Sequence, residues 1–295
     1  MLSKQKSKIK YVPEVSFYYR SDAFELEVVE LETLQQRSNQ WETRPNLPHR
    51  LGFNILIVIE QGTGYHLIDF EKTYFQAGSV LFVNKGQIQA FDFSNKLKGK
   101  VIIYTELFLT RLHSKLSIPF SLGSTMPKTF VPHISLNKSL EQSTMRLIDE
   151  LNVEISQANP FLEIIISLFG ALIMILSRER KNLTYTLPSS HLKKFVAFQK
   201  IIESHYNDTR EAGFYADKLG ITYKTLNLLC KKISGVTAKS YIDRYVVLEA
   251  KRRLVIEQCD IDSLAEYLGF KETTNFTKFF KRHTQISPSH FRDNV

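Results

Sequence analysis

The sequence predicts an α+β protein, with a β-rich N-terminal half, a helical segment and an all-α C-terminal third. Three observations support this prediction. Short apolar runs punctuated by glycine fill residues 20–105. From Lys138 onward the apolar residues recur at the spacing of one helix face. The last third contains the same pattern of two helices and a turn twice. The 295 residues have room for about two domains at roughly 150 residues each.

The first predicted domain, residues 21–135, consists of strands and follows a basic tail, residues 1–20. Residues 25–32 alternate polar and apolar side chains, as a half-buried strand does. Further strand candidates, separated by glycines, are residues 54–60, 65–70, 80–83, 88–93 and 101–104. Short strands at near-regular spacing with turn signals favour a β-sandwich or barrel.

A helical segment, residues 136–181, follows the strands. Its first helix begins at Lys138 and places Leu140, Leu147, Ile148, Leu151 and Ile155 on one face. A second helix over residues 161–180 is apolar most of the way round. Such a helix must be covered on several sides, either by the core of the same chain or by a second subunit. Residues 182–190 are uncharged, contain proline and are expected to be a linker.

The C-terminal domain, residues 191–295, contains an internal repeat. The segment ADKLGI at Ala216 returns as AEYLGF at Ala265, and LNLLCKK at Leu226 returns as FTKFFKR at Phe276. Each copy is predicted to form a helix, a glycine-containing turn and a second helix. This is the helix-turn-helix, whose second helix enters the DNA major groove. The region carries 18 Lys and Arg against 12 Asp and Glu, in a chain of net charge +9, which suits a polyanionic partner.

In the first copy, residues 211–219 form the first helix and Gly220 permits the turn. Thr222 is expected to cap the second helix, residues 223–234, because its hydroxyl can accept a free backbone N–H. Leu226 and Leu229 face inward. The side chains left to point outward are Tyr223, Lys224, Thr225, Asn227 and Leu228.

In the second copy, Asp262 is expected to cap the helix of residues 263–268, and Gly269 makes the turn. The second helix spans residues 272–284. Its core candidates are Phe276, Phe279 and Phe280. Its outward candidates are Thr273, Thr274, Asn275 and Lys278.

These outward residue types suit the edges of bases. Asn can pair with adenine, Lys with guanine acceptors, and a Thr methyl with the thymine methyl. Further DNA-contact candidates are basic and suit phosphates, which position a protein without specifying sequence; they are Lys231, Lys232, Arg244, Lys281 and Arg282. One helix over residues 240–258 separates the copies. At ~1.5 Å per residue it spans nearly 30 Å, so it could hold the two recognition helices about one DNA turn, ~34 Å, apart.

Residues 191–292 resemble the DNA-binding domain of the AraC/XylS family of bacterial transcription regulators. The resemblance is carried by LGIT–YKTLNLLCKKISG (residues 219–235), YIDRYVVLEAKRRL (241–254) and DIDSLAEYLGF–TTNFTKFFKRHTQISPSHFR (260–292). It implies base-facing positions for Lys224, Asn227, Leu228, Thr273, Thr274 and Lys278, and a position near phosphate for Thr277. Three residues depart from the family pattern: Leu228 stands where Arg or another polar residue is common, Cys230 replaces Phe, and Gln285 replaces Gly.

The N-terminal half is similar to the cupin-type sensor domain of AraC-like regulators, through its glycine-spaced strands from Gly62 to Gln87. The resemblance implies a barrel that senses a small molecule and adjacent helices that dimerise. A cupin metal site needs several converging N and O donors. In this half the sequence supplies only His49 and His66 as candidate metal ligands, and Gln89 stands where metal-binding cupins have a ligand. We therefore expect no metal and no cofactor, and we expect both histidines to be ordinary surface or strand residues.

Other features exclude several classes of protein. Cys230 and Cys259 are too few for a disulfide scaffold and have no CxxC partner. The most apolar run, residues 164–176, is shorter than the ~20 residues that span a bilayer, and no signal peptide is recognisable. No phosphate-binding loop, dinucleotide fingerprint, zinc-protease or serine-hydrolase motif occurs. We expect a cytoplasmic, non-enzymatic homodimer without a membrane partner.

The expected partners are promoter DNA, a small-molecule effector and RNA polymerase. Two alternatives stay open: a metal-dependent cupin enzyme fused to a DNA-binding domain, and a regulator without a ligand. The sequence identifies neither the effector nor the operator, and it does not distinguish activation from repression.

Overall fold

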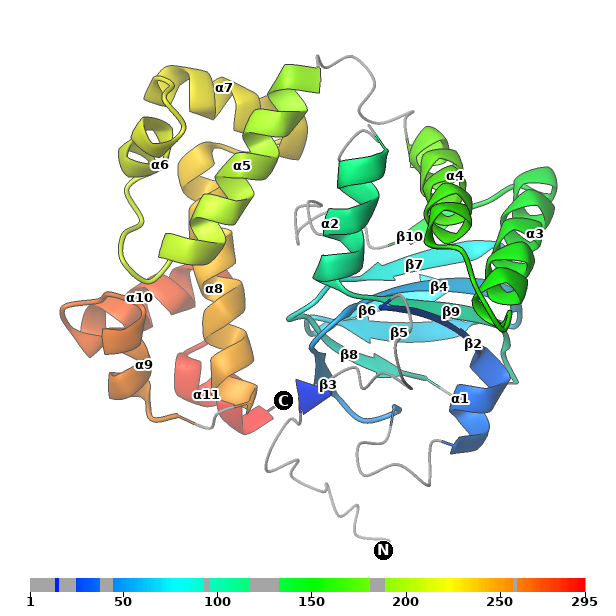
Figure 1. Ribbon diagram of the computed structural model, residues 1–295. Coiled ribbons are helices and arrows are strands. Elements are labelled where there is room, and N and C mark those ends of the chain that lie inside the picture. The colour runs from blue at the N-terminus through cyan, green and yellow to red at the C-terminus, as the bar shows by residue number, and fades with distance from the viewer. Residues whose placement is uncertain are drawn as a thin grey trace, which may run out of the picture. The chain divides into compact units, whose positions relative to one another are not determined.

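The computed structural model describes residues 14–15, 25–37, 45–92, 96–116, 133–180, 189–256 and 259–294 (Figure 1). The chain divides into two compact units, one covering residues 14–199 and the other containing residues 200–295. The boundary falls inside helix α5 (Ser189–His205) rather than at residue 191. Most of the expected tail and linker lies outside the described residues.

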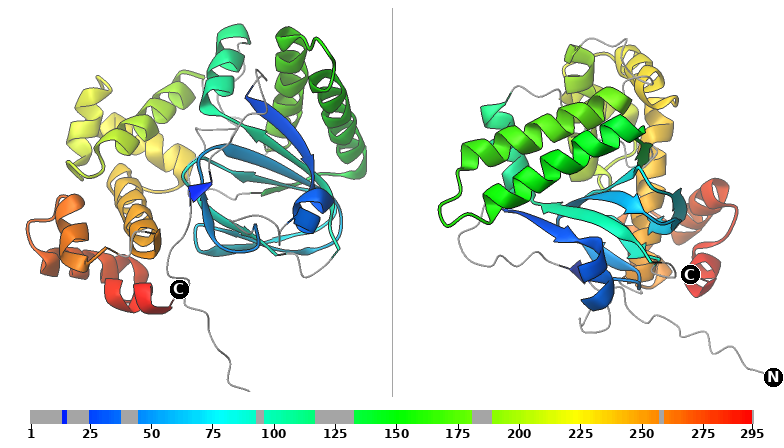
Figure 2. Two further views of the ribbon diagram at one scale, coloured as in Figure 1. Left: turned by 60° about the horizontal axis from the view of Figure 1, so that its bottom comes forward. Right: turned by 90° about the vertical axis from the view of Figure 1, so that its right-hand side faces the viewer.

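The N-terminal unit contains two five-stranded sheets. The first has the order β1 (Glu14–Val15), β3 (His49–Leu51), β8 (Ile88–Phe91), β5 (Gly64–Ile68), β6 (Glu71–Phe75). The second has the order β10 (His133–Ser135), β7 (Ser79–Val83), β4 (Asn54–Gln61), β9 (Lys98–Tyr104), β2 (Leu26–Glu30). Neighbouring strands are antiparallel except β1 and β3. Within the described residues no ladder joins the two sheets, so the expected barrel is an open sandwich (Figure 2).

Several strand boundaries differ from the sequence prediction. The strand expected over residues 25–32 ends at Glu30, and helix α1 (Leu31–Arg37) begins directly after it. The strand expected over residues 65–70 ends at Ile68, because Asp69 and Phe70 adopt positive φ angles of 47° and 73°. This turn leads into β6, which was not predicted because EKTYF contains few apolar residues.

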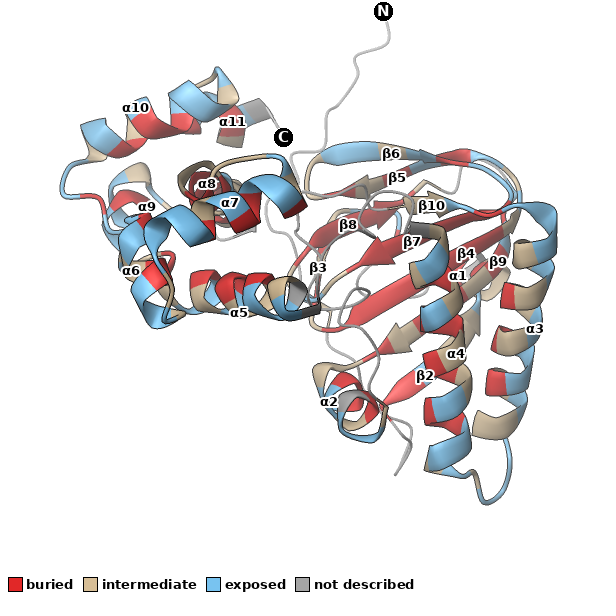
Figure 3. Ribbon diagram, turned by 90° about the horizontal axis from the view of Figure 1, so that it is seen from above, coloured by how far each residue is buried: buried red, intermediate tan, exposed pale blue. Residues whose placement is uncertain are grey.

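An apolar core lies between the two sheets. Alternate residues of β4 contribute Ile55, Ile57 and Ile59, which join Leu81 of β7 and Val101 of β9. The residues in between, such as Leu56 and Val58, belong to a second core on the other face of the sheet. Both faces of β4 are therefore buried (Figure 3), which explains why its sequence is continuously apolar rather than alternating.

Helices α2 (Glu106–Lys115), α3 (Lys138–Ile155) and α4 (Leu162–Arg180) build this second core with the outer face of the β4 sheet. Phe169 of α4 packs against the rings of Tyr104 and Phe108, with ring centroids 5.1 and 5.2 Å away. Lys100 of β9 bridges to Asp149 of α3 and to Glu30 of β2. The predicted helix face of α3 is confirmed, and the inner side of α4 is covered by its own chain.

The C-terminal unit is all-α, as predicted. It contains the end of α5 followed by α6 (Ala212–Lys218), α7 (Tyr223–Ser234), α8 (Ala238–Ile256), α9 (Ile261–Tyr267), α10 (Thr273–Thr284) and α11 (Pro288–Asn294). Four residues of α8 that recur every fourth position, Ile242, Val246, Ala250 and Leu254, are inaccessible to solvent. No helix among the described residues is long and apolar enough to cross a membrane.

Candidate nucleic-acid interface

Helix α7 is the second helix of the first copy, and its bounds match the prediction. The Thr222 hydroxyl accepts a hydrogen bond from the Thr225 N–H at 3.1 Å, as expected of the cap. Leu226, Leu229 and Cys230 are buried. Burial raises the pKa of the Cys230 thiol to about 12, so this side chain stays protonated and acts as a small apolar core residue.

The opposite side of α7 is exposed. Tyr223, Lys224, Thr225, Leu228, Lys231 and Lys232 all lie on it. Asn227 differs from the expectation of an outward side chain: it is half-buried, and its Oδ1 accepts a hydrogen bond from the Ala238 N–H at 3.1 Å. The first N–H groups of a helix lack partners within the helix, and Asn227 satisfies one at the start of α8.

Helix α10 is the second helix of the second copy. Phe276, Phe279 and Phe280 are buried as predicted. The rings of Phe270 and Phe276 are 5.3 Å apart, and those of Phe280 and Phe291 are 5.8 Å apart. This aromatic core fixes which face of α10 points outward. The residues on that face are Thr274, Asn275, Lys278, Lys281 and Arg282, while Thr277 is half-buried; Arg244 of α8 is also exposed.

The predicted cap of α9 was wrong. Asp260, not Asp262, precedes the helix, and its carboxylate accepts hydrogen bonds from the Ser263 N–H at 2.8 Å and the Ser263 hydroxyl at 2.6 Å. Asp262 lies in the first turn and accepts the Thr273 hydroxyl hydrogen instead. Two Asp residues stand two positions apart, and local sequence does not distinguish which of them adopts the extended backbone of a cap.

The two threonines at the start of α10 also have intramolecular partners. Thr273 is half-buried and donates to Asp262, and the Thr274 hydroxyl donates to Glu272 Oε2 at 3.1 Å. The hydroxyls of both threonines that the sequence places at base-facing positions are therefore held by carboxylates.

Contacts far apart in the sequence join the second copy to the residues before the first. The hydroxyls of Tyr206 and Tyr267 are 3.0 Å apart, and the Arg253 guanidinium lies 3.7 Å from the centroid of the Tyr267 ring. The Gly269 turn packs against the backbone carbonyl of Asn207: a Cβ at Gly269 would lie 2.4 Å from that oxygen. These contacts were missed by sequence reasoning, because no local pattern marks them. They tie the second copy to the segment that precedes the first, while α8 packs against both α7 and α10.

The N-terminal unit contains a buried polar cluster formed by His49, His66 and Gln89. The expectation that both histidines are ordinary surface or strand residues was wrong, since strand register turns all three side chains into the sandwich. Gln89 Nε2 lies 2.7 Å from His49 Nε2. Burial lowers the pKa of His66 to about 3, and a hydrogen bond with the Gln89 side chain opposes this shift only in part.

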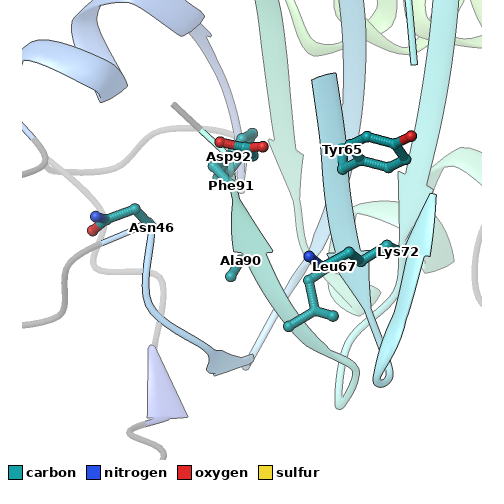
Figure 4. A pocket seen from close by; sticks show the side chains of 7 residues that line it. All are labelled: Asn46, Tyr65, Leu67, Lys72, Ala90, Phe91 and Asp92. Carbon is teal, nitrogen blue, oxygen red and sulfur yellow. The ribbon is translucent and has the colours of Figure 1, made fainter. Parts of the chain in front are cut away.

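An open groove lies on the other face of the same sheet (Figure 4). Leu67 and Ala90 pair across β5 and β8 and line this groove, whereas their neighbours His66 and Gln89 point inward. Tyr65, Lys72 and Asp92 complete its walls with Asn46. In the part of the chain that the structure describes, no group of three or more His, Cys, Asp or Glu side chains could hold a metal ion.

Known proteins are similar to this chain or to parts of it. The sequence model of a helix-turn-helix domain matches residues 215–294. The HTH-type transcriptional activator RhaS of Escherichia coli O157:H7 is 23% identical over 259 residues, which cover 84% of this chain and 90% of the relative. Two solved structures are also similar. Unsaturated fatty acid bound wild-type ToxT from Vibrio cholerae strain SCE256 is 12% identical, with 90% of this chain and 94% of that chain covered and a TM-score of 0.44. The C-terminal domain of the two-component response regulator yesN from Fusobacterium nucleatum subsp. nucleatum is 28% identical, with 32% and 93% covered and a TM-score of 0.31.

Two basic helix-turn-helix copies in one compact unit, which follows a sheet-rich unit in the sequence, define a DNA-binding transcription regulator. Residues 215–294 of its C-terminal unit match the model of a helix-turn-helix domain, which is the motif that the sequence predicted.

Proposed function

We propose that this regulator inserts α7 and α10 into two successive major-groove segments of a promoter. One observation supports this proposal above the others: both helices bury their apolar face in the same compact unit and leave basic side chains exposed on the other side. Both α7 and α10 pack against α8, and the second copy is also tied to Tyr206 and Asn207 before the first copy, which suits a site with a fixed spacing.

Selection of duplexes bound by the full chain from a random pool tests this proposal. We expect a site with two short blocks whose centres lie about one helical turn, ~10 bp, apart. A pool that fails to converge would contradict sequence-specific binding. A single block without a second would contradict the use of both helices.

A row of exposed and half-buried apolar residues on α4 and just before it supports dimerisation as a further part of the proposal. Phe161, Ile164, Leu168, Ala171 and Ile175 follow one another at alternating spacings of three and four residues, which is the seam of a coiled coil. Phe161 is 64% exposed and Ile164 is 44% exposed. We infer that this seam packs against the same seam of a second copy.

Sedimentation of the full chain tests the seam. Ile164→Lys should shift the protein from dimer toward monomer, because it buries a charge in the interface. Gln142→Lys on the exposed surface of α3 is the matched control and should leave the dimer intact. If both variants sediment with the same oligomeric state, the proposed seam is wrong.

The buried polar cluster supports an effector in the N-terminal unit. Buried polar groups are nearly always hydrogen-bonded, and here one amide, Gln89, is the shared partner of both His49 and His66, so some donors and acceptors of the cluster are left over. A small polar effector that offers both donor and acceptor groups would satisfy them. An effector would act by binding more tightly to one of two arrangements of the protein than to the other.

A thermal-shift screen of the full chain against small polar molecules tests the effector. A compound that stabilises the wild type but not the His66→Phe variant would support the cluster as its site. A screen without any stabilising compound favours the regulator without a ligand. Stoichiometric iron, manganese or zinc in the purified protein would favour the cupin enzyme over the non-enzymatic regulator. A DNA-binding function implies a cytoplasmic location in a bacterium, with RNA polymerase as a further partner.

A further inference from the structure

Leu228 is an exposed apolar residue on the outer face of α7, and its side chain is 53% exposed. Single exposed leucines are common on protein surfaces, so exposure alone assigns nothing. Three large apolar residues of the C-terminal unit are strongly exposed among those the structure describes, and two of them, Tyr223 and Leu228, lie on this one helix. The concentration on the recognition helix indicates a surface that is covered when the protein binds its partner.

The neighbours of Leu228 identify that partner. Residues four apart on a helix lie one above the other on the same face. Lys224 and Lys232 therefore lie one turn before and one turn after Leu228, and both are exposed. The two lysines suit the phosphates of a polyanion, and the leucine between them suits an apolar group that lies between those phosphates. Among the base edges of the major groove, the thymine C5-methyl group is that apolar group.

We propose that Leu228 contacts the C5-methyl group of one thymine in the DNA block bound by α7, while Lys224 and Lys232 approach the flanking phosphates or base acceptors. The inference rests on the proposed function, because it requires α7 to lie in the major groove. It assigns to the first copy an apolar base contact, in contrast to the polar contacts that its other outward residues offer.

Deoxyuridine tests this contact, because it differs from thymidine only by that methyl group. Duplexes carrying the selected site would be prepared with each thymine replaced in turn, and the affinity of the full chain for each would be measured. We expect one position in one block at which deoxyuridine weakens wild-type binding about threefold to fivefold, the effect of one buried methyl group. Leu228→Ala should bind the thymine duplex more weakly and lose its sensitivity to deoxyuridine at that position.

Two further variants make the test selective. Lys232→Ala should weaken binding to every duplex and keep the sensitivity to deoxyuridine at that position. Leu228→Gln should shift the selected base at that position from thymine toward adenine, with which an amide pairs. Because Leu228 is exposed, its variants should keep the thermal midpoint of the wild type.

Three results would overturn the inference: blocks without thymine, a wild type that is insensitive to deoxyuridine at every position, or a Leu228→Ala variant with undiminished sensitivity. A random pool that does not converge would instead contradict the proposed function itself. The two failures are therefore distinguishable.

Discussion

Gln285 holds the same left-handed backbone conformation as Gly235, the residue at the equivalent position of the first copy. The φ angle is 67° at Gln285 and 72° at Gly235. Each residue ends a recognition helix, and its N–H donates to the carbonyl four residues earlier, Lys281 or Lys231. The turn geometry is therefore kept in both copies although the residue type is not. A residue with a Cβ atom is strained in this region by about 1–2 kcal/mol.

Gln285→Gly should stabilise the C-terminal unit by about 0.5–1 kcal/mol, since part of the relieved strain is offset by the greater freedom of glycine in the unfolded chain. Urea unfolding of the full chain measures the change. Gln285→Ala, which keeps the Cβ, is the control and should not stabilise. Equal effects of the two substitutions would contradict the strain at this position.

Gly220 and Gly269 make the equivalent turns of the two copies but should tolerate alanine differently. Both have positive φ, 63° and 71°. At Gly220 a Cβ meets no atom within 4 Å, whereas at Gly269 it would lie 2.4 Å from the Asn207 carbonyl oxygen. We expect Gly220→Ala to cost about 1 kcal/mol of unfolding free energy, and Gly269→Ala to cost roughly 1–3 kcal/mol more through overpacking. Similar losses would show that the turn does not press on Asn207.

Lys278 and Lys231 should contribute to binding in different ways. Lys278→Ala should cost about 1–3 kcal/mol on the selected site and relax the preference at one base position. Lys231 lies late in α7, so Lys231→Ala should weaken all sequences alike and lower the slope of log affinity against log salt by about 1. Titrations of both variants at several salt concentrations measure this. If both variants bind the selected site with the affinity of the wild type at every salt concentration, the assignment of the recognition helices is wrong.

His66 should make the stability of the N-terminal unit depend on pH. Its pKa is about 3 in the folded protein against an ordinary value of 6.5, because burial disfavours the charged ring. Between these values the unfolded chain binds a proton that the folded chain does not. Stability should therefore be highest above pH 6.5 and fall by up to about 1.4 kcal/mol per pH unit below it.

Hydrogen exchange of the β5 and β8 amides at pH 7.5 and pH 5.5, corrected for the intrinsic rates, measures this loss. His66→Phe should reduce the difference between the two pH values. His290→Gln removes an exposed histidine and is the control. An unchanged pH dependence in His66→Phe would contradict the prediction.

The DNA contacts of individual residues stay predictions, but the placement of their side chains was partly foreseeable. The inward faces of α7 and α10 follow from helical periodicity alone, so Leu226, Phe276 and Phe280 were identified correctly. Asn227 was not, because its neighbour on the inward side becomes known only when α8 packs against α7. The same reason applies to Thr273, whose hydroxyl meets an Asp from the preceding helix.

The sequence by itself determined the two helix-turn-helix copies, their turn glycines, the cap of α7 at Thr222 and the strand-rich N-terminal half, because these depend on local periodicity and backbone conformation. Tertiary structure alone decided the open pairing of the two sheets, the burial of His66 and Gln89, and the bracing of Tyr206 against Tyr267. These features arise where segments distant in the chain meet. No local pattern encodes such meetings, since they are set by strand register and by the packing of complete elements.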